Sequence, residues 1–241
     1  MFNSEHFIWI GLCAAFVVVM TLVSVKGKWS LKTAGLIMTA ICVASEVSKM
    51  MSSMEESPTG EGMVLDPGAL PFHLCSLLLL TVFPITFGKD GRIKQILMDF
   101  MAFAGPIGSL YAILIPTNGT DFADLGAYQC FVFHAALMWF SFYLIGSGKA
   151  KLGLKTYGRN AIVLVAVSVG TLYVNSVLSV YGTNFMYLVR PPMDNLPILN
   201  LDNGWYVYFL TLMGIGAVVL TLYHLPFILI ERRKNREGQD K

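Results

Sequence analysis

Thiol and imidazole side chains inside apolar segments are the residues of this sequence that could do chemistry. His73 and Cys75 stand two residues apart in one apolar run. His134 follows Cys130 by four residues, about one helical turn, in another. Imidazole accepts a proton near neutral pH, and a thiol becomes a nucleophile when a base removes its proton. These residues predict a nucleophile-and-base site, with His134 or His73 as the base and either Cys75 or an activated water as the nucleophile.

Other polar residues occur at a similar depth in separate apolar runs. At ~1.5 Å per residue, Glu46, Cys75 and His134 lie about 8 to 9 Å from the outer ends of their runs, and Asn175 is comparable. Ionisable groups inside a membrane are costly and are therefore functional candidates. We expect Glu46, His73, Cys75, His134 and Asn175 to line one outward-facing cavity, with His134 as the base.

Each of these residues also has a structural alternative. Glu46 and Lys49 are three residues apart and could only neutralise each other. His134 could donate to a backbone carbonyl, Cys75 could be a packing residue, and Asn175 could bridge helices.

A zinc site is a minor alternative for the same cysteines and histidines. Cys130 and His134 share a helix face, but His73 and Cys75 point about 200° apart on a regular helix. We therefore expect no metal and no cofactor. A separate pair, Asp99 and His224, lies at matched depth near the cytoplasmic ends of two runs and is predicted to be structural.

The elements that must position these residues are apolar runs long enough to cross a bilayer as helices. The seven runs are 7–25, 31–51, 70–87, 93–115, 128–146, 160–181 and 205–230. They predict an all-α bundle of seven transmembrane helices in a single domain spanning residues 1–241, with a short basic tail over 231–241. Gly105, Pro106 and Gly108 in the fourth run predict close helix packing at the centre of the bundle.

Composition agrees with a membrane protein. Of the 241 residues, 55% are hydrophobic and 13% are charged, with a mean hydropathy of +0.63. A water-soluble fold is excluded by this composition. The net charge of +2 provides no basic excess for nucleic acid. The four cysteines lie in apolar runs without a disulfide spacing pattern, and we expect free thiols.

Lys and Arg residues are distributed unevenly between the connections. If the runs span alternately, 15 of the 17 basic residues fall on one side, and Lys49 and Arg190 are the two on the other. The positive-inside rule then predicts an outer N-terminus and a cytoplasmic C-terminus. Lys49 and Arg190 adjoin the predicted cavity and could hold a lipid phosphate. They could equally pair with acidic groups or reach to the surface.

Several motifs resemble those of a known family. They are Leu70-Pro71-Phe72-His73-Leu74-Cys75-Ser76, Phe133-His134, and Asn175 followed by Tyr181-Gly182-Thr183-Asn184-Phe185-Met186-Tyr187-Leu188. The chain resembles the bacterial YwaF-like integral membrane proteins, which look like relatives of transmembrane protein 164, an acyltransferase that remodels phospholipids. The resemblance implies a multi-pass protein of a bacterial plasma membrane, with His73 and His134 as the shared pair and Asn184 near the substrate.

The sequence departs from the acyltransferase branch at one position. In that branch the proposed nucleophilic cysteine directly precedes the first histidine, where this chain has Phe72. Cys75 either replaces that thiol or is unrelated to it. The leading hypothesis is a lipid-modifying enzyme that transfers or hydrolyses an acyl group, with a membrane lipid as partner. The alternative is a non-enzymatic small-ligand or proton-coupled transporter or binding protein that uses the same cavity.

Overall fold

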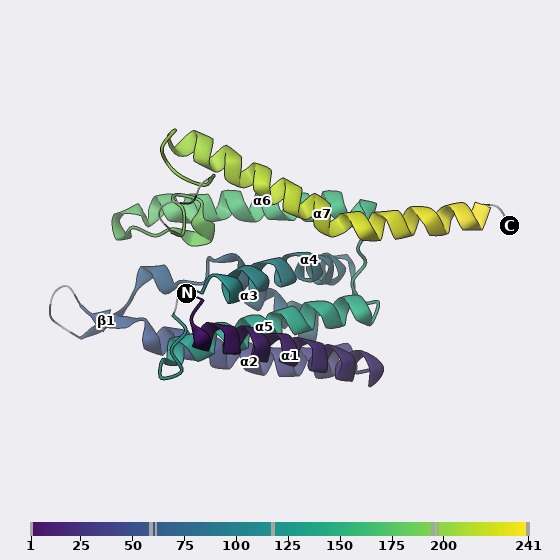
Figure 1. The fold of residues 1–241 in the computed structure, drawn as a ribbon, viewed down its shortest axis with the longest axis horizontal. Coiled ribbons are helices and arrows are strands. Elements are labelled where there is room, and N and C mark those ends of the chain that lie inside the picture. The colour runs from purple at the N-terminus through teal and green to yellow at the C-terminus, as the bar shows by residue number, and fades with distance from the viewer. Residues whose placement is uncertain are drawn as a thin grey trace. The chain divides into compact units, whose positions relative to one another are not determined.

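The chain is largely helical in a computed structural model that describes residues 2–57, 60, 62–116, 119–193, 196 and 198–239. The helices are α1 (Ser4–Lys26), α2 (Leu31–Ser52), α3 (Leu74–Phe87), α4 (Arg92–Leu114), α5 (Leu125–Gly146), α6 (Leu154–Val177) and α7 (Trp205–Gln239). Short 3-10 turns are η1 (Pro67–Ala69), η2 (Ser179–Tyr181) and η3 (Phe185–Tyr187). The predicted helical class is confirmed (Figure 1).

A small β-hairpin, which the sequence analysis did not predict, follows α2. Its strands, β1 (Met54–Glu56) and β2 (Met63–Leu65), pair antiparallel with Glu55 opposite Val64. The strands are largely exposed. The hairpin leads directly into η1 and the segment that carries His73.

Six of the helices are long and apolar enough to cross a membrane, and the exception is α3. With 14 residues, α3 is about 21 Å long, less than the ~30 Å of a hydrocarbon core. Our predicted run began at Leu70, whereas the helix begins at Leu74 with His73 at its N-cap. Pro71 explains the difference, because proline lacks an N–H group and disfavours helical backbone at the preceding residue.

The chain divides into two compact units, Met1–Ala150 and Lys151–Lys241, and each is described here by itself. The single domain over residues 1–241 stays a prediction. Of the predicted basic tail, residues 231–239 continue α7 as helix, and residues 240 and 241 lie outside the described part of the chain.

The first unit is built around α4 and α5, its most buried helices. α5 packs against α1, α2 and α4, while α3 packs against α2 and α4. A methyl group at Gly105 would lie 2.1 Å from the Ser141 hydroxyl, so α4 and α5 approach closely where glycine was predicted to permit it. The Ser141 hydroxyl also donates to the Met101 carbonyl of α4 at 3.0 Å.

The second unit contains α6 and α7 as an antiparallel pair. The hydroxyls of Tyr157 and Thr221 lie 3.1 Å apart, and Asn160 Nδ2 lies 3.2 Å from His224 Nε2. The loop between the two helices contains η2 and η3. Polar contacts at helical spacing thus fix the register of α6 against α7.

Candidate functional site

His134 has one of its two ring nitrogens committed to its own helix. Its Nδ1 lies 2.6 Å from the Cys130 carbonyl oxygen and 3.7 Å from the Cys130 thiol. A carbonyl oxygen only accepts, so Nδ1 carries the hydrogen and Nε2 keeps its lone pair. The structural role and the base role that the sequence allowed for His134 are therefore compatible. His134 donates to a backbone carbonyl, and its second nitrogen keeps the capacity to act as a base.

Cys75 lies on the first turn of α3 and faces neighbouring helices. A methyl group at Gly108 of α4 would lie 3.1 Å from the Cys75 sulfur. The Cys75 thiol is also close enough to the Cys130 thiol of α5 for the two to interact electrostatically. Since Cys130 contacts the His134 ring and interacts with Cys75, two helices, α3 and α5, contribute two thiols and an imidazole to one cluster, Cys75, Cys130 and His134.

Glu46 and Lys49 form an ion pair on the last turns of α2. The Lys49 ammonium lies 2.8 Å from the Glu46 carboxylate, and both side chains are partly exposed. Lys49 also acts electrostatically on His73. The mutual neutralisation of Glu46 and Lys49 that their spacing allowed is therefore present.

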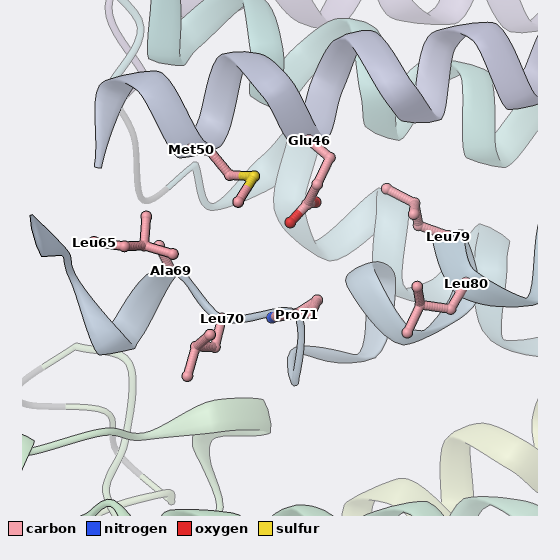
Figure 2. Close-up of a pocket in the computed structure, with 8 residues that line it drawn as sticks. All are labelled: Glu46, Met50, Leu65, Ala69, Leu70, Pro71, Leu79 and Leu80. Atoms are coloured by element: carbon pink, nitrogen blue, oxygen red, sulfur yellow. The ribbon is translucent and has the colours of Figure 1, made fainter. Parts of the chain in front are cut away.

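A pocket with a volume of about 200 Å³ lies next to this ion pair. Its walls come from α2, β2, η1 and α3, and its lining residues are Glu46, Met50, Leu65, Ala69, Leu70, Pro71, Leu79 and Leu80. Figure 2 shows the Glu46 carboxylate directed from α2 toward the segment that contains Pro71. Apart from Glu46 the lining is apolar, as expected for a site that takes hydrocarbon with one polar group at its edge.

The second unit contains the other predicted substrate-binding residues, and their polar groups contact backbone. The Asn175 amide donates to the Phe185 carbonyl at 3.0 Å and accepts from the Phe185 N–H at 2.8 Å. The Asn184 amide accepts from the N–H groups of Val189 and Arg190 and donates to the Arg190 carbonyl. The Arg190 guanidinium donates to the Gly182 carbonyl at 2.9 Å. These contacts fold the loop that the Gly-Thr-Asn motif begins.

Gly182 shows why this motif needs its glycine. Its φ of 65° lies in the left-handed region, which favours glycine, and its N–H closes η2 by donating to the Ser179 carbonyl. The sequence analysis assigned the motif to the site and missed its role in folding the loop. Because each unit is described by itself, a cavity shared by Asn175 and the residues of the first unit stays a prediction.

The family follows from a comparison with family models. A model described as the TMEM164 family matches residues 1–224. The chain belongs to the TMEM164 family. No curated protein and no solved structure matches the chain. The predicted relationship to transmembrane protein 164 is confirmed, and every predicted site residue lies within the matched range.

In this TMEM164-family chain, Asp99 and His224 each have a partner in their own unit. The Gln95 amide donates to Asp99 at 2.8 Å. The His224 Nε2 atom accepts from Asn160, and its Nδ1 donates to the Leu220 carbonyl at 3.0 Å. The direct pairing of Asp99 with His224 stays a prediction.

No group of three or more His, Cys, Asp or Glu side chains suited to a metal ion occurs among residues 2–57, 60, 62–116, 119–193, 196 and 198–239. The four cysteines are free thiols.

Proposed function

We propose that the chain is a membrane-embedded enzyme that modifies lipids by transferring or hydrolysing an acyl group. The observation that carries this proposal is the cluster of Cys75, Cys130 and His134. A histidine with its Nδ1–H held by a carbonyl presents Nε2 as a base, the Cys130 thiol lies beside it, and Cys75 interacts with Cys130. Membership of the TMEM164 family supports a multi-pass membrane protein, and the acyl chemistry is our inference.

The reaction has two balanced steps. A histidine, His134 or His73, takes the proton of the Cys75 thiol, and the sulfur attacks the acyl carbonyl of a phospholipid. The ester C–O bond breaks, the leaving alkoxide receives the proton, and a thioester remains on Cys75. The hydroxyl of a lysolipid, or water, then attacks the thioester with the same histidine as base, and this releases the thiol. In a variant of this scheme, the histidine activates water directly and hydrolysis is the only outcome.

The lipid would be held by the apolar pocket and the polar groups at its edge. Seven apolar residues of the lining suit a hydrocarbon chain, and the ion pair of Glu46 and Lys49 suits a headgroup. Arg190, Asn175 and Asn184 remain proposed substrate contacts, although their polar atoms are already engaged in the loop of the second unit.

The proposed topology has seven spans, an outer N-terminus and a cytoplasmic C-terminus in a bacterial plasma membrane. Six long apolar helices and the 15 of 17 basic residues on one side support it. The short α3 would then cross together with the non-helical segment before it, which contains His73 and Pro71.

The test is a lipid assay on the purified chain in nanodiscs, which measures both acyl transfer to a lysophospholipid and release of fatty acid. We expect turnover for the wild type and a loss of roughly 10²- to 10⁴-fold for His134→Ala. The control is His6→Ala, which removes an imidazole that binds the Ile113 carbonyl in the same unit. No turnover in any preparation that still binds lipid would favour the alternative of a transporter or binding protein.

A further inference from the structure

The end of α7 extends well past the apolar part of the helix. With 35 residues, α7 is about 52 Å long, against ~30 Å for a hydrocarbon core. Its apolar stretch ends at Ile230, and Arg232, Arg233, Lys234 and Arg236 follow, all exposed. At ~1.5 Å per residue these cations begin about 3 Å beyond Ile230 and end about 9 Å beyond it. They therefore stay within one Debye length, about 8 to 10 Å, of a bilayer surface.

The beginning of α6 contributes cations to the same end of the second unit. The Leu154 N–H donates to the Glu231 carboxylate at 3.1 Å, so the first turn of α6 adjoins this part of α7. Lys151 and Lys155 flank that turn and are exposed. We call this set the basic end, and its members are Lys151, Lys155, Arg232, Arg233, Lys234 and Arg236.

The carboxylates at the basic end offset only part of its charge. Glu231 accepts from the first turn of α6, and Glu237 pairs with Arg233 at 3.0 Å. Within the described part of α7 and the first turn of α6, five cations therefore face two carboxylates. Such a surface attracts anions, and arginine's planar fork is suited to phosphate.

We propose that the basic end binds the headgroups of anionic phospholipids. A lipid surface fits better than an acidic protein, because the cations gather where two apolar helices leave their hydrophobic stretch, at headgroup level. The family model ends at residue 224, before the cations of α7. The inference is also independent of the proposed acyl chemistry, since it uses no residue of the thiol and imidazole cluster.

The experiment measures lipid selectivity of the full chain by native mass spectrometry in detergent, with phosphatidylglycerol and phosphatidylcholine as probes. We expect the wild type to bind phosphatidylglycerol about tenfold more tightly, and high salt to reduce that preference. The test variant is Arg232→Gln/Arg233→Gln/Lys234→Gln/Arg236→Gln, and it should lose the preference. A control with the same change in charge, Lys26→Gln/Lys28→Gln/Lys32→Gln/Lys89→Gln, removes exposed cations of the first unit and should keep it.

Three results would overturn the proposal. They are an equal loss in the test and control variants, a wild-type preference that does not respond to salt, and binding of an acidic peptide without any preference between the two lipids. The salt titration uses the wild type alone, so the proposal remains testable if the fourfold variant does not fold.

Discussion

Polar side chains within the helices of this chain differ in how many of their hydrogen-bonding atoms the fold uses. Asn175 is 2% exposed, and its amide donates to and accepts from the backbone of Phe185. His134 uses Nδ1 in a bond to the Cys130 carbonyl, which leaves the chemistry of Nε2 open. A side chain with its polar atoms engaged stabilises the fold, whereas one with a basic atom remaining can act on a substrate.

Replacing Asn175 with alanine should therefore destabilise the protein more than it weakens catalysis. The Phe185 N–H and carbonyl would lose their partners, at a cost of about 2 kcal/mol or more in the free energy of unfolding. The measurement is unfolding in denaturing detergent beside lipid kinetics, with Asn200→Ala as a control because Asn200 lies in the same connecting segment and binds only local backbone. Unchanged stability would contradict the role of Asn175 in folding the loop.

Gly108→Ala tests whether the position of the Cys75 thiol matters. The new methyl would lie 3.1 Å from the Cys75 sulfur, so the thiol must shift by a few tenths of an ångström. We expect turnover to fall about tenfold, because the rate depends steeply on the position of the nucleophile. The stability of the helix should rise by up to about 1 kcal/mol, since alanine replaces glycine. Gly170→Ala, in α6, brings the new methyl within 4 Å of no described atom beyond its own stretch of helix, and it should leave turnover unchanged. An unaffected rate in Gly108→Ala would remove Cys75 from the reaction.

Among the elements, α6 and α7 stabilise each other through a charged cap. The Glu231 carboxylate accepts from the N–H of Leu154 in the first turn of α6, where the helix dipole favours negative charge. A methyl at Gly153 would lie 2.4 Å from the same carboxylate and would displace it. The glycine and the glutamate therefore act as one capping unit.

A double-mutant cycle of Gly153→Ala and Glu231→Gln tests this unit. Each single change should lower the free energy of unfolding by about 0.3 to 1 kcal/mol, since each removes the charged cap. The double change should cost little more than either alone. Arg233→Gln, which breaks an exposed pair with Glu237, serves as the control and should have almost no effect. Additive losses would show that the two residues act separately.

The bounds of the helices agree only in part with the apolar runs in the sequence. Apolar length predicted seven spans, because crossing lipid demands a minimum run, and six of them are helices long and apolar enough to cross. α6 begins at Leu154, earlier than its apolar run, and α7 continues beyond its run to Gln239. In both places Lys and Arg end the apolar run without ending the helix, since they are good helix formers.

Contacts within one helix were accessible from the sequence, and contacts between elements were not. The Cys130–His134 and Glu46–Lys49 contacts follow from spacings of four and three residues. The approach of Cys75 to Gly108 depends on how α3 packs against α4. The cavity position of Asn175 is predicted from its estimated depth, whereas its partner, ten residues on in a folded loop, could not be predicted.

For the whole molecule, the distribution of basic residues predicts its orientation. If the seven runs span alternately, 15 of 17 Lys and Arg residues fall on one side, and a reporter fused after the C-terminus should be active only in the cytoplasm. An N-terminal reporter should be active only outside. The paired fusions serve as controls for each other, and a C-terminal signal from outside the cell would contradict the orientation.

The central claim is that Cys75 forms a covalent acyl intermediate in the first unit. The most direct measurement is peptide mass spectrometry of the purified chain after incubation with a phospholipid acyl donor. We predict a hydroxylamine-sensitive acyl group on Cys75 in the wild type and in Cys42→Ala, which removes a different buried thiol. The adduct and acyl transfer should both disappear in Cys75→Ala. Full turnover by Cys75→Ala, or an acyl group on Cys130 instead, would contradict the account.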